Sequence, residues 1–309
     1  MAAELPFFSI IIPTYNRADR LRACLSGIAQ VDYPRDHFEV IIVDDGSPQP
    51  LDSVIVPFQD MLDITLLRQT NSGPARARNV GLALAKGTLI AFLDDDCTPA
   101  WDWLHSLAER SILFPECMIG GHTLNALPWN LCSTASQLIA DVVYRYYNAD
   151  PENARFITSN NMLVPAKALR EIGQFDASFS TSAAEDRELC DRWRHNGYQI
   201  VYAPEALIHH AHAMSLRGYL RQHFNYGRGA CHFHRKRAAR GVNSFAPEVG
   251  FHRRIGNWLL YPISQVRSWR KPLMFGLIVA WQAANALGYF YEVFRSQERF
   301  QRHRLGIER

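Results

Sequence analysis

Three consecutive aspartates, Asp94, Asp95 and Asp96, directly follow the apolar run Leu89–Leu93. Adjacent carboxylates repel one another unless a cation shares them, and oxygen ligands of this kind suit Mg²⁺ or Mn²⁺. The apolar run predicts a buried strand, and open α/β sheets bind ligands at the carboxyl ends of their strands. The alternative is a helix N-cap before Trp101. Because a cap needs only one aspartate, the three together favour a metal site.

Two further apolar runs, at residues 8–12 and 40–43, also end in polar or turn-forming residues. The residues that follow them are Pro13, Thr14, Tyr15, Asp44 and Asp45. Because the carboxyl ends of neighbouring parallel strands lie at one edge of a sheet, we expect all three strand ends to meet there. A nucleotide with a metal-bound diphosphate is the ligand that this pattern predicts.

Composition limits the class of protein. The chain has 309 residues, of which 48% are hydrophobic, enough for one large or two modest domains with buried cores. Its six cysteines are scattered, so we expect reduced thiols in a cytosolic environment rather than a disulfide framework or a zinc site. No basic and apolar leader precedes the first strand-like run, so we expect no cleaved signal peptide.

Strand-like and helix-like stretches alternate over about the first 125 residues. Strands are expected near residues 8–12, 40–43, 64–67 and 89–93, and helices at 75–85 and about 101–114. This alternation predicts an α/β fold with a mostly parallel, doubly wound sheet. Beyond residue 130 we expect strands at 156–164 and 199–202, a loop at 180–184 and a helix that begins at Glu185. Helices dominate after Met214.

Five motifs occur in order along the chain and together resemble the family 2 glycosyltransferases. These are inverting enzymes of GT-A fold that use nucleotide-diphosphate sugars, and the resemblance covers about residues 7–212. The motifs are SIIIPTYNR at 9–17, VDDGS at 43–47, NSGPARARNVG at 71–81, FLDDD at 92–96 and Glu185-Asp186.

The resemblance implies a nucleotide pocket. In it Asp44, with Asp45 behind it, would accept a hydrogen bond from the base, and Asp94 would face the ribose. Arg78 would lie near the base or the diphosphate. The pocket would be lined by Pro13, Thr14 and Tyr15.

The resemblance also implies the residues of catalysis. Asp96 would bind the divalent cation, Mn²⁺ or Mg²⁺, that bridges the two phosphates, whereas Asp95 would not touch the ligand. Asp186 would be the general base, with Glu185 orienting the acceptor or the base. The alternative for this pair is ordinary, since acids in the first turn complement a helix dipole.

Three histidines near residue 210 raise the question of a second metal ligand. Side chains adjacent on an extended segment point to opposite faces, so three shared ligands are not expected. The resemblance implies one histidine ligand to the metal or diphosphate, and we assign it to His210. His209 and His212 are expected to be structural or surface residues.

The C-terminal part carries the opposite charge to the rest. Residues 1–216 hold 26 acidic and 16 basic residues, and residues 217–309 hold four acidic and 17 basic ones. We expect a GT-A domain at 1–216 and a basic helical extension at 217–309. An anionic partner suits the extension, and the interleaved Trp258, Trp269 and Trp281 favour a membrane over nucleic acid.

Residues 272–291 form an uncharged stretch long enough to cross a bilayer. Three interpretations stay open: an interfacial or re-entrant helix, a single membrane span, or a helix that packs in a soluble protein or dimer. Positive residues flank the stretch on both sides, so its orientation is undefined.

The sequence thus predicts transfer of a sugar from a nucleotide-diphosphate sugar to an acceptor hydroxyl. The acceptor would be a glycan or a lipid-linked, cell-envelope glycan, reached on the cytoplasmic side of the membrane. Two alternatives are a sugar-phosphate nucleotidyltransferase and a non-catalytic, membrane-bound glycan-binding scaffold. The first lacks its Gly-rich loop after the first strand, and the second would not need Asp94, Asp96 and Asp186.

Overall fold

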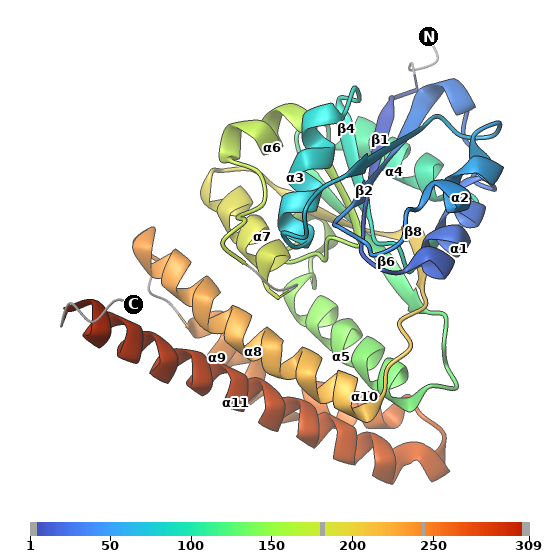
Figure 1. Cartoon of the computed structure of the whole chain (residues 1–309). Coiled ribbons are helices and arrows are strands. Elements are labelled where there is room, and N and C mark those ends of the chain that lie inside the picture. Colours follow the sequence, from blue (N-terminus) through green and yellow to red (C-terminus); the bar gives the residue numbers. More distant parts are fainter. Residues whose placement is uncertain (1–4, 180–182, 243–244, 305–309) are drawn as a thin grey trace. The chain divides into compact units, whose positions relative to one another are not determined.

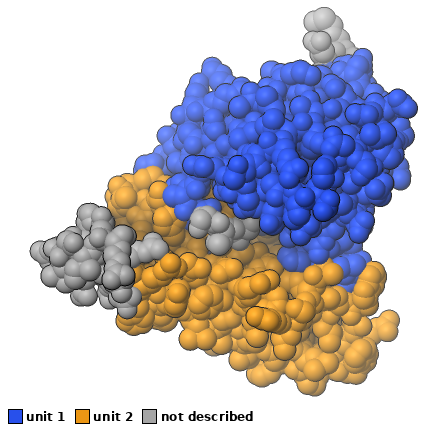
Figure 2. Space-filling model, viewed as in Figure 1, with its two compact units in different colours: residues 1–127, 147–180, 186–212 blue, residues 128–146, 181–185, 213–309 orange. Residues whose placement is uncertain are grey.

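The computed structural model describes residues 5–179, 183–242 and 245–304. The chain forms two compact units, coloured separately in Figure 2, and each is assembled from stretches that are distant in sequence. Unit 1 consists of Met1–Leu127, Tyr147–Ser180 and Asp186–His212. Unit 2 consists of Pro128–Tyr146, Thr181–Glu185 and Ala213–Arg309.

Unit 1 is built on one mixed sheet (Figure 1). The strands of the described residues are β1 (Phe8–Thr14), β2 (Phe38–Asp44), β3 (Ile64–Arg68), β4 (Leu89–Leu93), β5 (Cys97–Pro99), β6 (Met118–Asn125), β7 (Asn161–Pro165) and β8 (Ile200–His210). Their order is β3-β2-β1-β4-β7-β6-β8-β5. The β3-β2-β1-β4 half is parallel, β6 and β8 are parallel, and the remaining pairs are antiparallel. The expected α/β architecture is confirmed.

Helices cover both faces of this sheet. They are α1 (Ala18–Ile28), α2 (Asp52–Ile55), α3 (Pro74–Leu84), α4 (Trp103–Leu113), α6 (Ala166–Ile172) and α7 (Glu185–His195). Short 3-10 turns lie at Arg35–His37, Val56–Phe58 and Pro151–Asn153. Side chains along β1 point alternately to the two faces of the sheet, and helices pack on both. Ile10 and Ile12 enter the core shared with α1, α2 and α4, whereas the side chain of Ile11 contacts Gly81 of α3.

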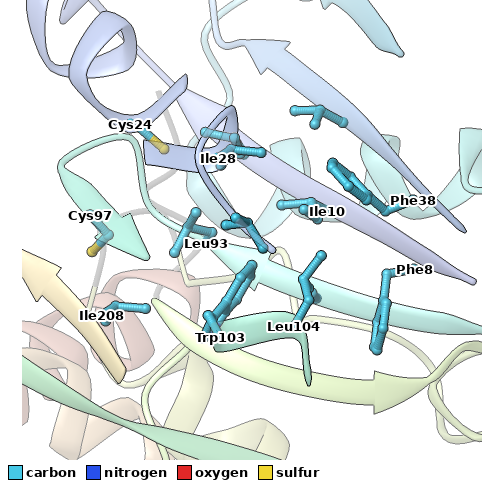
Figure 3. Packing of buried hydrophobic residues seen from close by; sticks show 14 of the residues in the cluster. Phe8, Ile10, Cys24, Ile28, Phe38, Leu93, Cys97, Trp103, Leu104 and Ile208 are labelled. Carbon is cyan, nitrogen blue, oxygen red and sulfur yellow. The ribbon is translucent and has the colours of Figure 1, made fainter. Parts of the chain in front are cut away.

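The main core of unit 1 lies between the sheet and α1, α2 and α4. Figure 3 shows Ile10 and Leu93 from the sheet packed with Ile28 of α1 and Trp103 of α4. All four side chains are fully buried. Complete burial of large apolar side chains, each stabilising by about 1.5–3 kcal/mol, gives the strand ends a rigid base.

Two strands differ from expectation. The strand expected at 156–164 is limited to β7, because the side chain of Asn148 takes up both backbone groups of Phe156, at 2.7 and 3.2 Å. β8 is longer than the expected 199–202. Pro204 and Glu205 break its apolar pattern, and a register shift at Gly121/His122 in β6 lets the pairing resume beyond them. Of the expected loop at 180–184, residues 180–182 lie outside the described ones.

Unit 2 is helical. Its helices are α5 (Leu131–Tyr147, whose last residue belongs to unit 1), α8 (Leu216–Ala239), α9 (Ala246–Arg253), α10 (Tyr261–Ser264) and α11 (Lys271–Arg304), with a π turn at Gly256–Leu260 and a 3-10 turn at Ser268–Arg270. One apolar cluster joins Ile139 of α5, Tyr219 of α8, Phe251 of α9 and Ile278 of α11. Thus α5 packs with residues beyond 216, although it lies within the segment expected to be the catalytic domain.

Helices α8 and α11 lie side by side (Figure 1). The Tyr219 hydroxyl donates to the Leu277 carbonyl at 3.0 Å, and Arg228 pairs with Glu292 at 2.8 Å. The outer positions of α11 are apolar, and its exposed large side chains include Leu273, Phe275, Val279, Leu287, Phe290, Tyr291 and Phe294. By length and composition the helical stretch Ser268–Ser296 could cross a membrane.

Candidate functional site

The carboxyl ends of β2, β1 and β4 lie next to one another in the sheet (Figure 1). Thr14 pairs in register with Asp44, and Asp94–Asp96 continue directly from β4. The two ends are also bonded, because the Thr14 hydroxyl donates to Asp95 at 2.7 Å. The predicted meeting of the three strand ends is therefore present in the fold.

Asp95 is a buried anchor of this edge. Besides the bond from Thr14, it accepts one from Arg17 at 3.1 Å, and its side chain is 3% exposed. Burial raises the pKa of Asp95 to about 6, although the Arg17 charge opposes the rise. Asp95 therefore ties β4 to β1 and to the start of α1.

Asp96 lies in a group of cationic or cation-binding side chains. Its Oδ2 is 2.9 Å from Arg20, and its Oδ1 is 3.1 Å from His210 Nε2. Burial alone would raise the pKa of Asp96, but the hydrogen bond and charge of His210 and the charge of Arg17 outweigh it and hold the pKa well below its usual value. For His210 the directions are reversed. Burial alone would lower its pKa, but the hydrogen bond and charge of Asp96 outweigh burial and raise it.

His212 joins the same group. Candidate ligand atoms of Asp96, His210 and His212 all lie within 4.8 Å of one another. Burial, with the nearby charge of His210, lowers the pKa of His212 to about 4, so this ring is neutral at physiological pH. One carboxylate and two imidazoles form a donor set that fits a divalent transition metal such as Mn²⁺. These residues could therefore hold a divalent cation.

The strands themselves position these ligands. β5 follows Asp96 directly and pairs with β8 so that Cys97 lies opposite His210. The Ala211 amide donates to the Asp96 carbonyl at 2.8 Å. Since backbone pairing fixes both segments, the group is preorganised rather than gathered from loose loops.

Asp94 is held from the other side of the β4 end. The buried Arg78 of α3 pairs with Asp94 at 2.8 Å and lies over the ring of Phe175, 5.4 Å from its centre. Asn79 fixes Phe175 through both backbone groups, at 2.8 and 3.0 Å. The Asp94 side chain is 32% exposed, so it can still meet a ligand.

The two aspartates after β2 have different environments. Asp44 is buried and accepts a bond from the Ser47 amide at 2.8 Å. Asp45 accepts from the amides of Ser72 and Gly73, both at 2.8 Å, and so fixes the loop that leads into α3. Gly73 has a φ of 89°, a conformation that favours glycine. Asp45 therefore supports the edge of the site through the backbone of this loop.

The remaining predicted residues have the following positions. Pro13 is buried within β1, whereas Tyr15, just after it, is 47% exposed. Asp186 lies in the first turn of α7, in the same unit as Asp96, and accepts a bond from the Arg187 amide at 2.7 Å. Glu185 is buried and belongs to unit 2.

The sequence reasoning missed three residues of the Asp96 group. His212 had been expected at the surface or in a structural role, although residues two apart on an extended segment share a face and could have been paired on that ground. Arg17 and Arg20 were also missed. Their spacing of three places them on one face of a helix, a signal that the sequence does contain. His209, as expected, is exposed.

Comparison with known proteins shows the family to which the chain belongs. The model of the family "Glycosyl transferase family 2" matches residues 9–173. The chain is 26% identical over 232 residues to glycosyltransferase AglE of Haloferax volcanii, covering 74% of each. It is 29% identical over 269 residues to the pre-mycofactocin glycosyltransferase of Mycobacterium tuberculosis, covering 82% of this chain and 52% of the relative, so it spans about half of that protein.

A solved structure shows the same fold. Mannosyltransferase PcManGT from Pyrobaculum calidifontis, determined in complex with GDP-Man and Mn²⁺, superposes with a TM-score of 0.62 at 19% identity, covering 99% of this chain and 84% of that one. The expected GT-A fold is thereby confirmed. The family match spans more than half of the chain, and the strand-end carboxylates lie within it. This chain belongs to glycosyltransferase family 2 and is an enzyme that transfers a sugar from a nucleotide sugar.

Proposed function

We propose that this glycosyltransferase moves a hexosyl group from a nucleotide-diphosphate sugar to an acceptor hydroxyl with inversion at the anomeric carbon. The observation that carries the proposal is the preorganised group of Asp96, His210 and His212 at the carboxyl end of β4, beside the ends of β1 and β2. A sugar diphosphate brings several negative charges to such a site, and its leaving group departs more readily when positive charge is near.

Asp96 and His210, joined by His212, would hold a divalent cation. Mn²⁺ is the first choice over Mg²⁺, because two imidazoles are poor ligands for Mg²⁺. When bound, the cation would neutralise charge on the departing diphosphate. PcManGT, which shares the fold of this chain, was determined with Mn²⁺ and GDP-Man, and this supports the same choice of cation here.

The nucleotide would lie along the ends of β1, β2 and β4. Asp44 would accept from the base, and Asp94, held by Arg78, would face the ribose. Thr14 and Asp45 would act mainly through structure, since Thr14 is bonded to Asp95 and Asp45 fixes the loop before α3. Pro13 and the exposed Tyr15 would complete the wall.

The acceptor hydroxyl needs a base, because a neutral hydroxyl is a weak nucleophile. A carboxylate at the start of α7 would supply it. We assign the role of general base to Asp186 and an orienting role to Glu185. Attack from the face opposite the diphosphate then gives inversion, and the proton moves from the acceptor oxygen to the carboxylate.

The acceptor would be a glycan or a lipid-linked glycan of the cell envelope, reached at the cytoplasmic face of a membrane. Support comes from α11, whose exposed large side chains from Leu273 to Phe294 are apolar over about 30 Å of helix. The adjacent helix α8 contains the exposed Arg217 and Arg221. Because α8 packs against α11, it would also enter the bilayer if α11 crossed it. Since an arginine at the bilayer centre costs at least about 2.5 kcal/mol, the pair would lie in the membrane plane.

A hydrolysis and transfer panel tests the enzyme proposal. The purified full chain is given UDP-, GDP- and dTDP-sugars with Mn²⁺, Mg²⁺ or a chelator, and release of the nucleoside diphosphate is measured. We expect release from one nucleotide class, dependent on divalent cation and faster with Mn²⁺. Release of pyrophosphate from a sugar phosphate and a nucleoside triphosphate would instead indicate a nucleotidyltransferase. Binding without turnover over the whole panel, acceptors included, would indicate a glycan-binding scaffold.

A further inference from the structure

Two arginines at the start of α1 contact the Asp96 group. Arg17 precedes α1 and contacts Asp95 at 3.1 Å and Asp96 at 3.4 Å, and Arg20 contacts Asp96 at 2.9 Å. The arginine side chains are 44% and 32% exposed, whereas both aspartates are 3% exposed. Both guanidinium groups can therefore move toward solvent while the carboxylates cannot.

Arg20 and a divalent cation have the same partner. The Oδ2 atom of Asp96 faces Arg20, and Oδ1 faces His210, which is itself a candidate ligand. A buried carboxylate needs compensating positive charge, and Arg20 supplies part of it when no cation is bound. A cation that arrives at Asp96 makes this part of the compensation redundant. It also places repulsive positive charge beside Arg20.

We propose that Arg20 is a counter-ion which a divalent cation displaces from Asp96, and that the released guanidinium then binds the diphosphate of the donor. This inference rests on the proposed metal site. Arg17 differs, because it also contacts Asp95, which is bonded to Thr14 as well and would keep Arg17 in place. Guanidinium groups match phosphate oxygens in a bidentate manner, so an arginine suits this second role.

The exchange couples the two ligands. Without donor, Arg20 competes with the cation and weakens its binding. With donor, the same side chain gains a new anionic partner, so cation and diphosphate favour one another's binding. Typical couplings of this kind change affinity by about 5- to 150-fold. Loss of Arg20 should therefore strengthen binding of the cation alone and weaken binding of the nucleotide.

Isothermal titration calorimetry on the full chain tests whether loss of Arg20 changes the affinities for cation and nucleotide in opposite directions. Mn²⁺ is titrated into wild type and Arg20→Gln without nucleotide, and then UDP and GDP are titrated in the presence of Mn²⁺. We expect Mn²⁺ alone to bind Arg20→Gln about 3- to 10-fold more tightly, because an ion pair of a partly exposed arginine is removed. We expect the nucleoside diphosphate to bind roughly tenfold more weakly, because a charged hydrogen bond is lost.

Two further variants separate this role from a structural one. Arg20→Lys keeps the charge and should lie closer to wild type in both titrations. Arg22→Gln changes an exposed arginine of the same helix and should match wild type. A merely destabilised site would lose affinity for both ligands, so tighter Mn²⁺ binding is the outcome that a structural role cannot produce.

The results distinguish the two proposals. If wild type shows no Mn²⁺-dependent nucleotide binding, the proposed function itself is wrong. If wild type binds both ligands, but Arg20→Gln binds Mn²⁺ no more tightly than wild type does, only the role of Arg20 is overturned.

Discussion

Asp95 and Asp96 are neighbours in the sequence and share a contact with Arg17, yet the other partners of their carboxylates differ. Asp95 is bonded to Thr14 of β1, and Asp96 contacts His210 of β8. Both residues lie in the turn between β4 and β5, which the Cys97 amide closes by donating to the Asp94 carbonyl at 3.0 Å, and this turn directs the two carboxylates to different strands. A run of three acids thus combines one structural carboxylate with two that can meet ligands, and each should respond differently to substitution.

We expect Asp96→Asn to lose Mn²⁺ binding, by at least the roughly 10- to 100-fold that loss of an outer-shell partner causes. Asp95→Asn should retain Mn²⁺ affinity within a few-fold but lower the free energy of unfolding by about 1–3 kcal/mol, because the buried bonds from Thr14 and Arg17 are weakened. Calorimetry with Mn²⁺ and thermal unfolding measure the two effects. Equal losses of Mn²⁺ affinity in the two variants would contradict the assignment.

The base assignment makes a separate prediction. Asp186→Asn keeps the shape of the side chain and removes its basicity, so donor binding should persist while transfer falls by roughly 10²- to 10⁴-fold. Transfer to acceptor and Mn²⁺-dependent nucleotide affinity are measured on the same preparation. Near-normal transfer would exclude Asp186 as the base and make Glu185 the next candidate.

Among individual residues, the sequence indicated the carboxylates at the strand ends, His210 and Arg78, but not the other partners of Asp96. Asp44, Asp94 and Asp96 were predictable, because acids that follow apolar strands must emerge at the sheet edge. His212 was not recognised, because its relevance depends on β5 lying against β8, a contact between segments far apart in sequence. Arg20 was not recognised, because it reaches Asp96 only through the packing of α1 against β5.

At the level of elements, strands were predictable where apolar residues continue without interruption, as in β1, β2 and β4. β8 was only partly predicted, since Pro204 interrupts its pattern and only the matching register shift in β6 shows that it continues. For residues 156–160, the side chain of Asn148 replaces the strand partner that the sequence pattern implies. Such side-chain substitutes for backbone pairing leave no periodic signal.

The α8–α11 pair offers a test of helix packing. A Cβ at Gly227 would overlap the Asn285 carbonyl oxygen, and one at Gly288 would overlap that of Phe224, so the helices meet at their glycines. Both Gly227→Ala and Gly288→Ala should lower the free energy of unfolding by about 1–3 kcal/mol, because the helices must move apart.

Gly276 of the same α11 is the matched control, since a Cβ there meets nothing within 4 Å. Gly276→Ala should be neutral or stabilise by up to about 1 kcal/mol through helix propensity. Thermal unfolding of the three variants decides the matter. Equal effects at Gly276 and Gly288 would show that close helix approach is unimportant.

For the whole molecule, the division of charge was predictable from sequence alone, but the grouping of α5 with residues beyond 216 was not. Apolar positions such as Ile139 are compatible with either unit, and only the packing against Phe251 and Ile278 places them. The expected boundary after residue 216 stays a prediction. The cluster around α5 indicates that removing residues 217–309 would expose apolar surface on this helix.

The apolar outer face of α11 predicts attachment to anionic membranes. We expect the full chain to float with vesicles that contain phosphatidylglycerol and to be released only partly by high salt, because salt screens the basic residues but not the apolar contact. Leu287→Glu should weaken flotation several-fold. Leu113→Glu is the control and should float like wild type. Leu113 lies in α4 and is 68% exposed, close to the 65% of Leu287.

Flotation lost equally in both variants would indicate a general effect of acidic charge. If the wild-type chain does not float with the vesicles, the prediction of membrane attachment is wrong, and the apolar face of α11 binds something other than lipid.

The pairing of β5 with β8 also governs the order in which the site can form during synthesis. Asp96 leaves the ribosome early, with β1, β2 and β4 already able to pair, but the residue after it, Cys97, pairs with His210 of β8. The group of Asp96, His210 and His212 therefore cannot assemble until nearly the whole of unit 1 has been translated. A nascent chain arrested before residue 210 would carry Asp96 and the ends of β1, β2 and β4, but not the two histidines of the candidate metal site.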